Sequence, residues 1–225
     1  SCVLRHQGAM DYQLKDRTCL VSGASSGIGA GVVRLLSQQG ARIVATARRA
    51  DKIERLDGVT VIAGDVTLPD DLARIAAEAG EVLGPIDILV NCAGGSRPTG
   101  PEAGEDVWEE AFALNFTAAR LLTKALLPAM RARKWGRIIN ISGSMEPRGL
   151  NAAIAAKAAL HLWAKGLSCD VAADDVTVNT IQPGRINSEQ ILHKLHPTEE
   201  ARRSFIERNI PIGYFGEPED VAHLV

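Results

Sequence analysis

The stretch TCLVSGASSGIG (residues 18–29) decides the fold of this chain. Its first five residues form a short apolar and β-branched run, and glycines follow at positions 23, 27 and 29. A diphosphate needs backbone N–H donors at close range, no Cβ in the way and a helix N-terminus behind them. Glycines in an ordinary tight turn are the alternative. Their place between a strand and a helix favours a dinucleotide-binding βαβ unit.

Short apolar runs alternate with longer segments of helical periodicity through the rest of the chain. Strands that are apolar on both faces and joined by helical crossovers predict a parallel sheet covered on both sides. Right-handed crossovers make a doubly wound, Rossmann-type α/β sheet the expected topology. The predicted strands are residues 18–22, 42–47, 59–64, 86–91, 137–142 and 176–181, and the predicted helices are residues 28–39, 69–82, 105–133 and 151–170.

The chain is expected to fold as one domain, because 225 residues with 46% hydrophobic content suffice for one core. Residues 1–13 lack periodicity and resemble a tag-like, disordered leader, so the domain is assigned to residues 14–225. Residues 185–216 have weaker periodicity and predict an excursion above the sheet, of the kind that forms substrate lids. Because the sequence stops within an apparent helix, we expect the last C-terminal strand to be missing and residues 176–181 to form an uncovered edge.

Composition excludes several classes of protein. A formal net charge of −2 gives no reason to expect a nucleic-acid or membrane-surface partner, and no apolar run approaches the ~20 residues that span a bilayer. The histidines of HKLH (193–196) have no carboxylate or cysteine at ligand spacing, so no metal site is expected. Scattered cysteines predict a reduced, cytoplasmic protein with buried thiols; they are Cys2, Cys19, Cys92 and Cys169.

The end of the second predicted strand indicates the type of cofactor. An acidic residue there would bind the 2′-hydroxyl of the adenosine ribose and favour NAD. This chain instead reads ATARRADK (45–52), with Arg48 and Arg49 directly after the strand. Guanidinium groups suit a 2′-phosphate, so the sequence predicts NADP(H) over NAD(H). Two solvated loop arginines are the alternative.

Further motifs, in the same order along the chain, resemble those of the short-chain dehydrogenase/reductase family. The glycine loop resembles TGxxxGIG, and GDV (64–66) resembles the segment that contacts adenine. NCAGG (91–95) resembles the NNAG motif beneath the cofactor, and VTVNTIQPGRINS (176–188) resembles VNxIxPGxIxT beside the nicotinamide. Together with the arginines, the resemblance implies a cofactor site of Gly23, Ser25, Ser26, Gly27, Ile28, Gly29, Arg48, Arg49, Asp65, Val66, Asn91, Ala93, Gly94, Lys157, Pro183, Gly184, Ile186 and Ser188.

The resemblance also implies the chemistry. Family members move a hydride between the nicotinamide and a carbonyl or carbinol carbon, while a Tyr–Lys pair handles the proton, a Ser fixes the carbonyl and an Asn orders a water. LNF (114–116) supplies Asn115 at the position of the catalytic Asn. LNAAIAAKAAL (150–160) supplies Lys157 at the position of the Lys. A surface lysine that extends its ammonium to water is the alternative for Lys157.

The catalytic tyrosine of the family is absent. Ala153 stands where the resemblance requires it, four residues before the lysine. The segment between the strand INIS (139–142) and that lysine is also shorter than in the family. The position of the catalytic serine therefore falls at Gly143, between two serines. We favour Ser144 as the catalytic serine, with Ser142 as the alternative.

These observations predict an NADP(H)-dependent oxidoreductase that interconverts a carbonyl and a secondary alcohol. The resemblance implies a 3-oxoacyl group as the carbonyl substrate. In this hypothesis a substitute acid such as Glu146, or a water held by Lys157 and Asn115, delivers the proton. The competing hypothesis is an NADP(H)-binding protein with weak or no turnover that acts as a sensor or partner subunit.

Two further expectations concern partners. Arg148 and Arg185 indicate an anionic group on the small-molecule substrate, or they are solvated loop residues. Helices 105–133 and 151–170 carry more apolar surface than one sheet face covers, and the resemblance implies that they pair in a homodimer or homotetramer.

Overall fold

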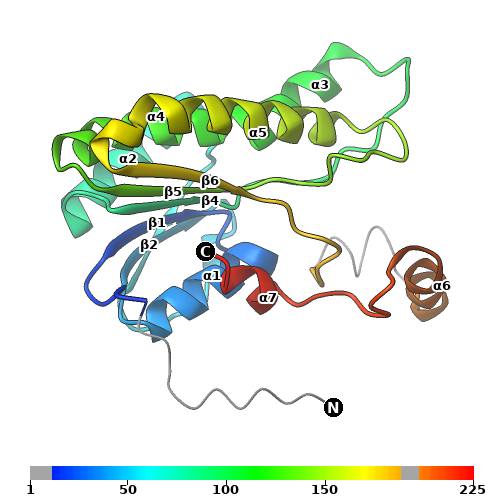
Figure 1. Ribbon diagram of the computed structural model, residues 1–225, viewed down its shortest axis with the longest axis horizontal. Helices are drawn as coiled ribbons and strands as arrows, with labels where there is room; N and C mark the ends of the chain where they lie inside the picture. Colours follow the sequence, from blue (N-terminus) through cyan, green and yellow to red (C-terminus); the bar gives the residue numbers. More distant parts are fainter. Residues whose placement is uncertain (1–11, 189–197) are drawn as a thin grey trace.

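The computed structural model describes residues 12–188 and 198–225, which form a parallel sheet with helices on both faces (Figure 1). The strand order is β3-β2-β1-β4-β5-β6, and every neighbouring pair is parallel. The order reverses between β1 and β4, where parallel sheets of this kind bind ligands at the strand ends. The predicted Rossmann-type α/β fold is confirmed. The strands are Thr18–Ser22 (β1), Arg42–Ala47 (β2), Val59–Ala63 (β3), Ile88–Asn91 (β4), Gly136–Ile141 (β5) and Val176–Ile181 (β6).

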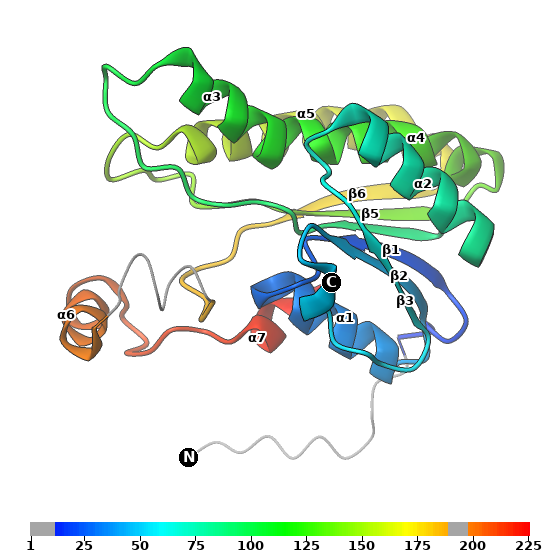
Figure 2. The same ribbon diagram turned by 180° about the vertical axis from the view of Figure 1, so that it is seen from behind.

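The helices form one layer on each side of the sheet (Figures 1 and 2). One face carries α2 (Pro69–Leu83), α4 (Ala118–Ala132) and α5 (Ala152–Val171), and the other carries α1 (Gly27–Gln38) and α7 (Pro218–Ala222). Short 3-10 turns cover Ala50–Lys52 and Ala172–Asp174. Successive strand residues point to opposite faces. In β1, Leu20 therefore packs in the core under α2 and α4, while Cys19 and Val21 pack against α1.

The segment predicted as one helix over residues 105–133 is interrupted. It consists of α3 (Glu105–Phe112), a π-helical turn (Ala113–Thr117) and α4. The turn contains Asn115, which is buried and whose Nδ2 donates to Ala111 O at 2.9 Å. Such single π turns are often found at functional sites. Apolar periodicity does not predict the break, because the apolar face continues through it.

Residues 185–216 contain a helix that the sequence does not predict, α6 (Glu199–Asn209). None of its residues is fully buried, so it carries no apolar stripe that would reveal it. In Figure 1 this helix lies beyond the carboxyl ends of the strands, apart from the sheet. The start and the end of this segment meet where Ile186 pairs with Gly216 in a parallel bridge. Its role as a substrate lid stays a prediction, and HKLH (193–196) lies outside the described residues.

The short helix α7 packs closely on α1. A Cβ at Gly31 would lie 2.8 Å from the Cβ of Pro218, and Arg34 forms an ion pair with Glu219 at 2.5 Å. At the other end of the strand order, β6 is the last strand among the described residues.

Three structural findings concern the cysteines, the helix lengths and the possible metal ligands. The prediction that the thiols are buried is wrong for Cys169, which is exposed on α5, whereas Cys19 is buried. Across the described ranges, no helix has the length and apolar character needed to cross a membrane. The same ranges contain no cluster of three or more histidine, cysteine or acidic residues placed to hold a metal ion.

Candidate active site

The glycine loop forms a tight cradle between β1 and α1. Gly23 has a φ of +71°, and a Cβ there would lie 2.7 Å from Ala93 N. A Cβ at Gly29 would lie 2.2 Å from Gly23 O, so neither position has room for a side chain. Gly27 adopts a φ of +54°, which also favours glycine. These glycines bring the backbone of the loop within direct reach of a ligand.

The N-terminus of α1 is open to an anion. Its N-cap, Ser26, makes no side-chain hydrogen bond to the helix, and the first turn holds no acidic residue. The Ser26 side chain therefore does not cap the first N–H groups of the helix, and the helix dipole adds positive potential. Ser25 and Ile28 lie half-buried in the same turn. The cradle fits the diphosphate of a dinucleotide.

The arginines after β2 lie beside this cradle. Arg49 Nη2 is 3.4 Å from Ser26 Oγ, and Arg48 Nη1 is 3.9 Å from Asp65 Oδ2. Asp65 Oδ1 accepts from Thr67 N at 2.9 Å, which fixes the GDV segment, and Val66 is buried. Both guanidinium groups are exposed. They lie at the end of β2, on the side of the glycine cradle.

Lys157 is buried in α5 rather than extended to water, so the surface-lysine alternative is wrong. Its Nζ donates to Ile141 O at 2.6 Å. Burial lowers the pKa of Lys157 from 10.5 to about 8, and the nearby Cys92 slightly opposes this shift. The position that a Cβ would take at Gly94 is 3.0 Å from both Lys157 Nζ and Asn115 Oδ1. The lysine and the asparagine thus converge on one side of Gly94.

Asn115 ties the π-helical turn to the NCAGG segment. Its Oδ1 accepts from Gly95 N at 3.0 Å, and its Nδ2 donates to Gly95 O at 3.2 Å. At the start of that segment, Asn91 lies inside the sheet, where its Nδ2 donates to Asn140 Oδ1 at 2.9 Å. Asn91 therefore links β4 to β5, while Ala93 is half-buried and Gly94 is exposed at the end of the strand.

The two candidate serines occupy different environments. Ser142 is buried, and its Oγ donates to Lys157 O at 3.4 Å. Ser144 is exposed, and its Oγ accepts from Glu146 N at 3.1 Å within its own loop. A Cβ at Gly143 would lie 3.9 Å from Lys157 Cγ. Position 143, which carries no hydroxyl, thus also lies near the lysine side chain. The choice of Ser144 stays a prediction.

Ala153 is buried in the first turn of α5, with 4% of its surface exposed. Its N–H donates to Asn151 Oδ1 at 3.0 Å, so Asn151 caps the helix. The same side chain accepts from Arg97 N at 3.2 Å and donates to Ser96 Oγ at 2.9 Å. Asn151 therefore joins the start of α5 to the loop after β4. Its position just before an apolar helical run is a cap signal that our sequence analysis missed.

The segment after β6 runs back toward the glycine cradle. Pro183 and Ile186 are half-buried, and Gly184 is exposed. The Cβ of Ser188 lies 3.4 Å from the place of a Cβ at Gly27. The structure thus brings the predicted residues of β1, β4, α5 and this segment to one edge of the sheet.

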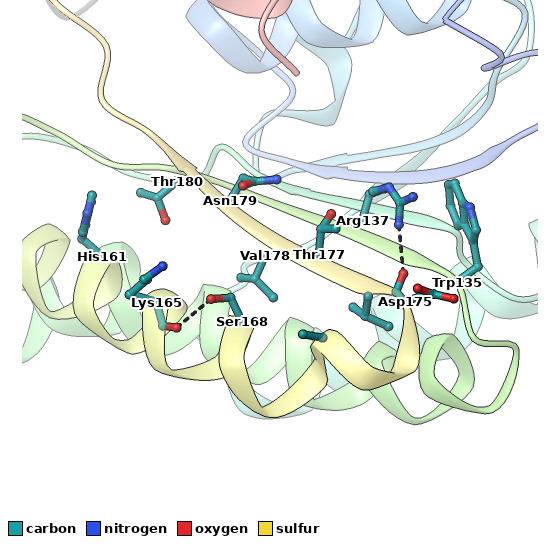
Figure 3. Close-up of a pocket in the computed structure, with 12 residues that line it drawn as sticks. Trp135, Arg137, His161, Lys165, Ser168, Asp175, Thr177, Val178, Asn179 and Thr180 are labelled. Atoms are coloured by element: carbon teal, nitrogen blue, oxygen red, sulfur yellow. Dashed lines mark hydrogen bonds between the residues drawn. The ribbon is translucent and has the colours of Figure 1, made fainter.

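Two cavities lie away from this edge. One, of 660 Å³, runs along the outer side of β6 between Trp135 and Thr180, with His161 and Lys165 of α5 beside it (Figure 3). The other, of 440 Å³, lies near α7 and the sheet face below β5 and β6. Neither is lined by the cradle glycines, Asn115 or Lys157. The convergence of polar groups, rather than cavity size, therefore places the candidate active site at the strand ends.

The sheet order, the glycine cradle and the buried lysine and asparagine define a Rossmann-type oxidoreductase domain. The short chain dehydrogenase family matches residues 17–200, and the chain belongs to this family.

The chain is similar along most of its length to proteins of known activity. It is 31% identical over 221 residues to 3-oxoacyl-[acyl-carrier-protein] reductase FabG of Vibrio cholerae, covering 94% of this chain and 89% of the relative. It is 34% identical over 224 residues to acetoacetyl-CoA reductase of Allochromatium vinosum, covering 93% and 89%. The structure of L-sorbose reductase from Gluconobacter frateurii, complexed with NADPH and L-sorbose, superposes with a TM-score of 0.87 at 28% identity, covering 96% and 90%.

Proposed function

We propose that this chain is an NADP(H)-dependent oxidoreductase that interconverts a carbonyl group and a secondary alcohol. The observation that carries the proposal is the convergence of Lys157 and Asn115 beside Gly94, at the same edge of the sheet as the glycine cradle. Burial of a charge is costly, so the buried ammonium of Lys157 favours a role in contacting a bound ligand at this edge.

The preference for NADP(H) rests on the arginines after β2. Arg48 and Arg49 lie at the position where an acidic residue would select NAD, and Arg49 reaches Ser26 of the cradle. The similar L-sorbose reductase structure contains NADPH. A 2′-phosphate would interact with one or both guanidinium groups.

The proposed substrate class is 3-oxoacyl compounds. Two relatives of more than 30% identity are named as reductases of 3-oxoacyl and acetoacetyl thioesters. The carbonyl carbon of such a substrate would lie beside Lys157, at the carboxyl ends of β4 and β5.

The chain supplies positioning and a proton. Bound nicotinamide supplies or accepts the hydride at the carbonyl carbon. With the cofactor bound, the Lys157 ammonium would donate to the nicotinamide ribose, while Asn115 holds the loop at Gly95 in place. With Ala153 in the position of the family tyrosine, the proton for the substrate oxygen comes from Lys157, directly or through one water. The pKa of Lys157, about 8, suits a general acid near neutral pH.

One observation favours a second function. Ala153 and Gly143 place no hydroxyl at either of two positions that the family chemistry uses. The second candidate is therefore an NADP(H)-binding protein without turnover, which acts as a sensor or partner subunit.

Calorimetry with NADPH and NADH, followed by NADPH oxidation on a panel of 3-oxoacyl thioesters, ketones and sugars, tests the proposal. We expect tighter NADPH binding, loss of that preference in Arg48→Asp, and slow turnover. Arg55→Asp is the matched control, because Arg55 is an exposed arginine outside the site. Tight NADPH binding without turnover on any compound would favour the second function, and absence of binding to either cofactor would overturn both.

A further inference from the structure

We propose that Arg148 and Arg185 form a binding site for an anionic group of the substrate, either a carboxylate or a phosphate. This inference rests on the proposed oxidoreductase function and specifies the chemistry of its substrate.

The two arginines come from neighbouring strand ends. Arg148 lies in the loop after β5, and Arg185 lies in the segment after β6. Both side chains contact α6. Arg148 Nη1 hydrogen-bonds to Asn209 Oδ1, and the guanidinium carbon of Arg185 lies 5.0 Å from the centre of the Phe205 ring. Arg148 and Arg185, which are 37 positions apart in the sequence (185 − 148), thus meet on one side of α6.

The position of Arg185 is fixed by the fold. Gly216 N donates to Arg185 O at 2.9 Å, and Asn187 N donates to Gly216 O at 2.7 Å, in the bridge that closes the excursion. Phe205 packs against the buried Phe215, with ring centres 6.2 Å apart. The aromatic surface under the guanidinium is thereby held in place, so the site exists before a ligand arrives.

Within the part of the chain that the structure describes, the two arginines have no acidic partner. In the described ranges, no carboxylate lies within ion-pair distance of either guanidinium. Partial burial, and then the charge of Arg148, lower the pKa of Arg185, which remains protonated at neutral pH. Other arginines of the chain do have acidic partners; Arg97, for example, pairs with Glu110 at 2.5 Å. Two like charges held together without a partner are unfavourable, and a bound anion would relieve that cost.

The chemistry of the pair selects the ligand. A guanidinium presents parallel N–H donors that match two oxygens of a carboxylate or phosphate. The segment that carries Arg185 continues to Ser188, which lies beside Gly27 of the cradle. The anion site and the cofactor cradle therefore lie along the same segment. A substrate that extends from the reacting carbonyl toward α6 would place its charged end at the arginines.

A structural role is the competing explanation, since cations are favourable near the C-terminus of a helix such as α6. That role would change stability but would not distinguish charged from neutral substrates. The decisive comparison therefore uses substrate pairs with the same carbonyl and different charge.

Steady-state NADPH oxidation would be measured with acetoacetate against ethyl acetoacetate, and with acetoacetyl-CoA against its N-acetylcysteamine thioester. The first pair tests for a small carboxylate and the second for the phosphates of a carrier. In Arg148→Ala and Arg185→Ala, we expect kcat/KM for the anionic member of one pair to fall about tenfold or more. The neutral member should change less than about twofold, and Arg185→Lys should retain part of the preference.

Arg203→Ala is the matched control, because Arg203 is an exposed arginine of α6 that pairs with Glu207. It should leave both substrate pairs unchanged. Equal losses on charged and neutral substrates, or no loss on either, would overturn the anion site.

Failure of the proposed function would be distinguishable. If no compound is turned over, the chain with excess NADPH would be titrated with inorganic phosphate at constant ionic strength in a calorimeter. NADPH covers Arg48 and Arg49, so the remaining phosphate binding reports on other sites. If the affinity for phosphate falls about tenfold in Arg185→Ala but not in Arg203→Ala, the result would support the anion site even without catalysis. Equal affinity in wild type and both variants would overturn it.

Discussion

Lys157 carries a charge that the fold buries, and this conflict predicts a pH dependence. Its pKa is about 8 in the folded chain, against 10.5 for a lysine exposed to water. Between these values the unfolded chain binds more protons, so the free energy of unfolding should rise with pH from about 8 to 10.5. Below pH 8 both states are protonated, and the cost of burial is fully present. Urea denaturation of the cofactor-free chain at a series of pH values would measure the slope.

Two variants control this experiment. Lys157→Met should abolish the contribution of this residue to the slope, because no titrating group remains. Lys165→Met, an exposed lysine of the same helix, should leave the slope unchanged. An identical slope in wild type and Lys157→Met would contradict the assignment of the shifted pKa to Lys157.

Ala153 allows a gain-of-function test. If the site is otherwise intact and lacks only its usual proton donor, Ala153→Tyr should raise kcat by about 10²-fold, the lower end of what a general acid contributes. Ala153→Phe introduces the same ring without the hydroxyl and should not increase turnover. Single-turnover NADPH oxidation at saturating substrate would compare the three proteins. Similar rates in the Tyr and Phe variants would show that the missing hydroxyl does not limit catalysis.

At the scale of single residues, spacing within one element predicts where a side chain of the candidate site lies in the fold. Lys157 is buried at the strand ends as the motif implies, and Asn115 lies beside it. The serine is different, because the loop after β5 has its own length and conformation. Spacing cannot tell which hydroxyl turns inward, and the structure shows Ser144 bonded within that loop.

At the scale of elements, the contact between α1 and α7 can be tested at Gly31. A Cβ at this position would lie 2.8 Å from Pro218, so Gly31→Val should push α7 away from α1 and lower the free energy of unfolding by about 1–3 kcal/mol. Denaturant titration would measure the change. Gly166→Ala in α5 is the control, because no atom lies within 4 Å of the added Cβ. It should stabilise the chain by about 0.5–1 kcal/mol. Equal effects of the two substitutions would argue against close helix packing at Gly31.

The elements that the sequence predicts are those that contribute to the core. The strands β1, β2, β4 and β5 bury most of their residues, so their apolar runs mark them within a few positions. The helix α6 buries none of its residues fully, and nothing in its periodicity reveals it. The π-helical turn around Asn115 escapes prediction for another reason, since it is stabilised by hydrogen bonds to Gly95 and Ala111 rather than by an apolar pattern.

At the scale of the whole molecule, topology follows from general rules more readily than local detail does. Parallel strands with right-handed crossovers leave few arrangements, and the observed strand order is the expected doubly wound one. The site then follows from the reversal between β1 and β4. What the sequence does not predict is the meeting of Arg148 and Arg185 at α6, because it depends on how two irregular segments fold over the strand ends.

The assembly of the chain is the remaining prediction at this scale, and α5 provides its test. We expect a homodimer or homotetramer whose subunits meet through α4 and α5. Leu162 projects from α5 with 74% of its surface exposed, which is costly unless another surface covers it. Leu162→Glu should therefore shift the mass measured by light scattering toward the monomer. Leu224→Glu is the control, since Leu224 is 70% exposed after α7 and should leave the mass unchanged. A wild-type chain of monomer mass would exclude the oligomer. A Leu162→Glu variant with the wild-type mass would place the interface elsewhere, because a buried carboxylate without a partner would weaken any interface that contains it.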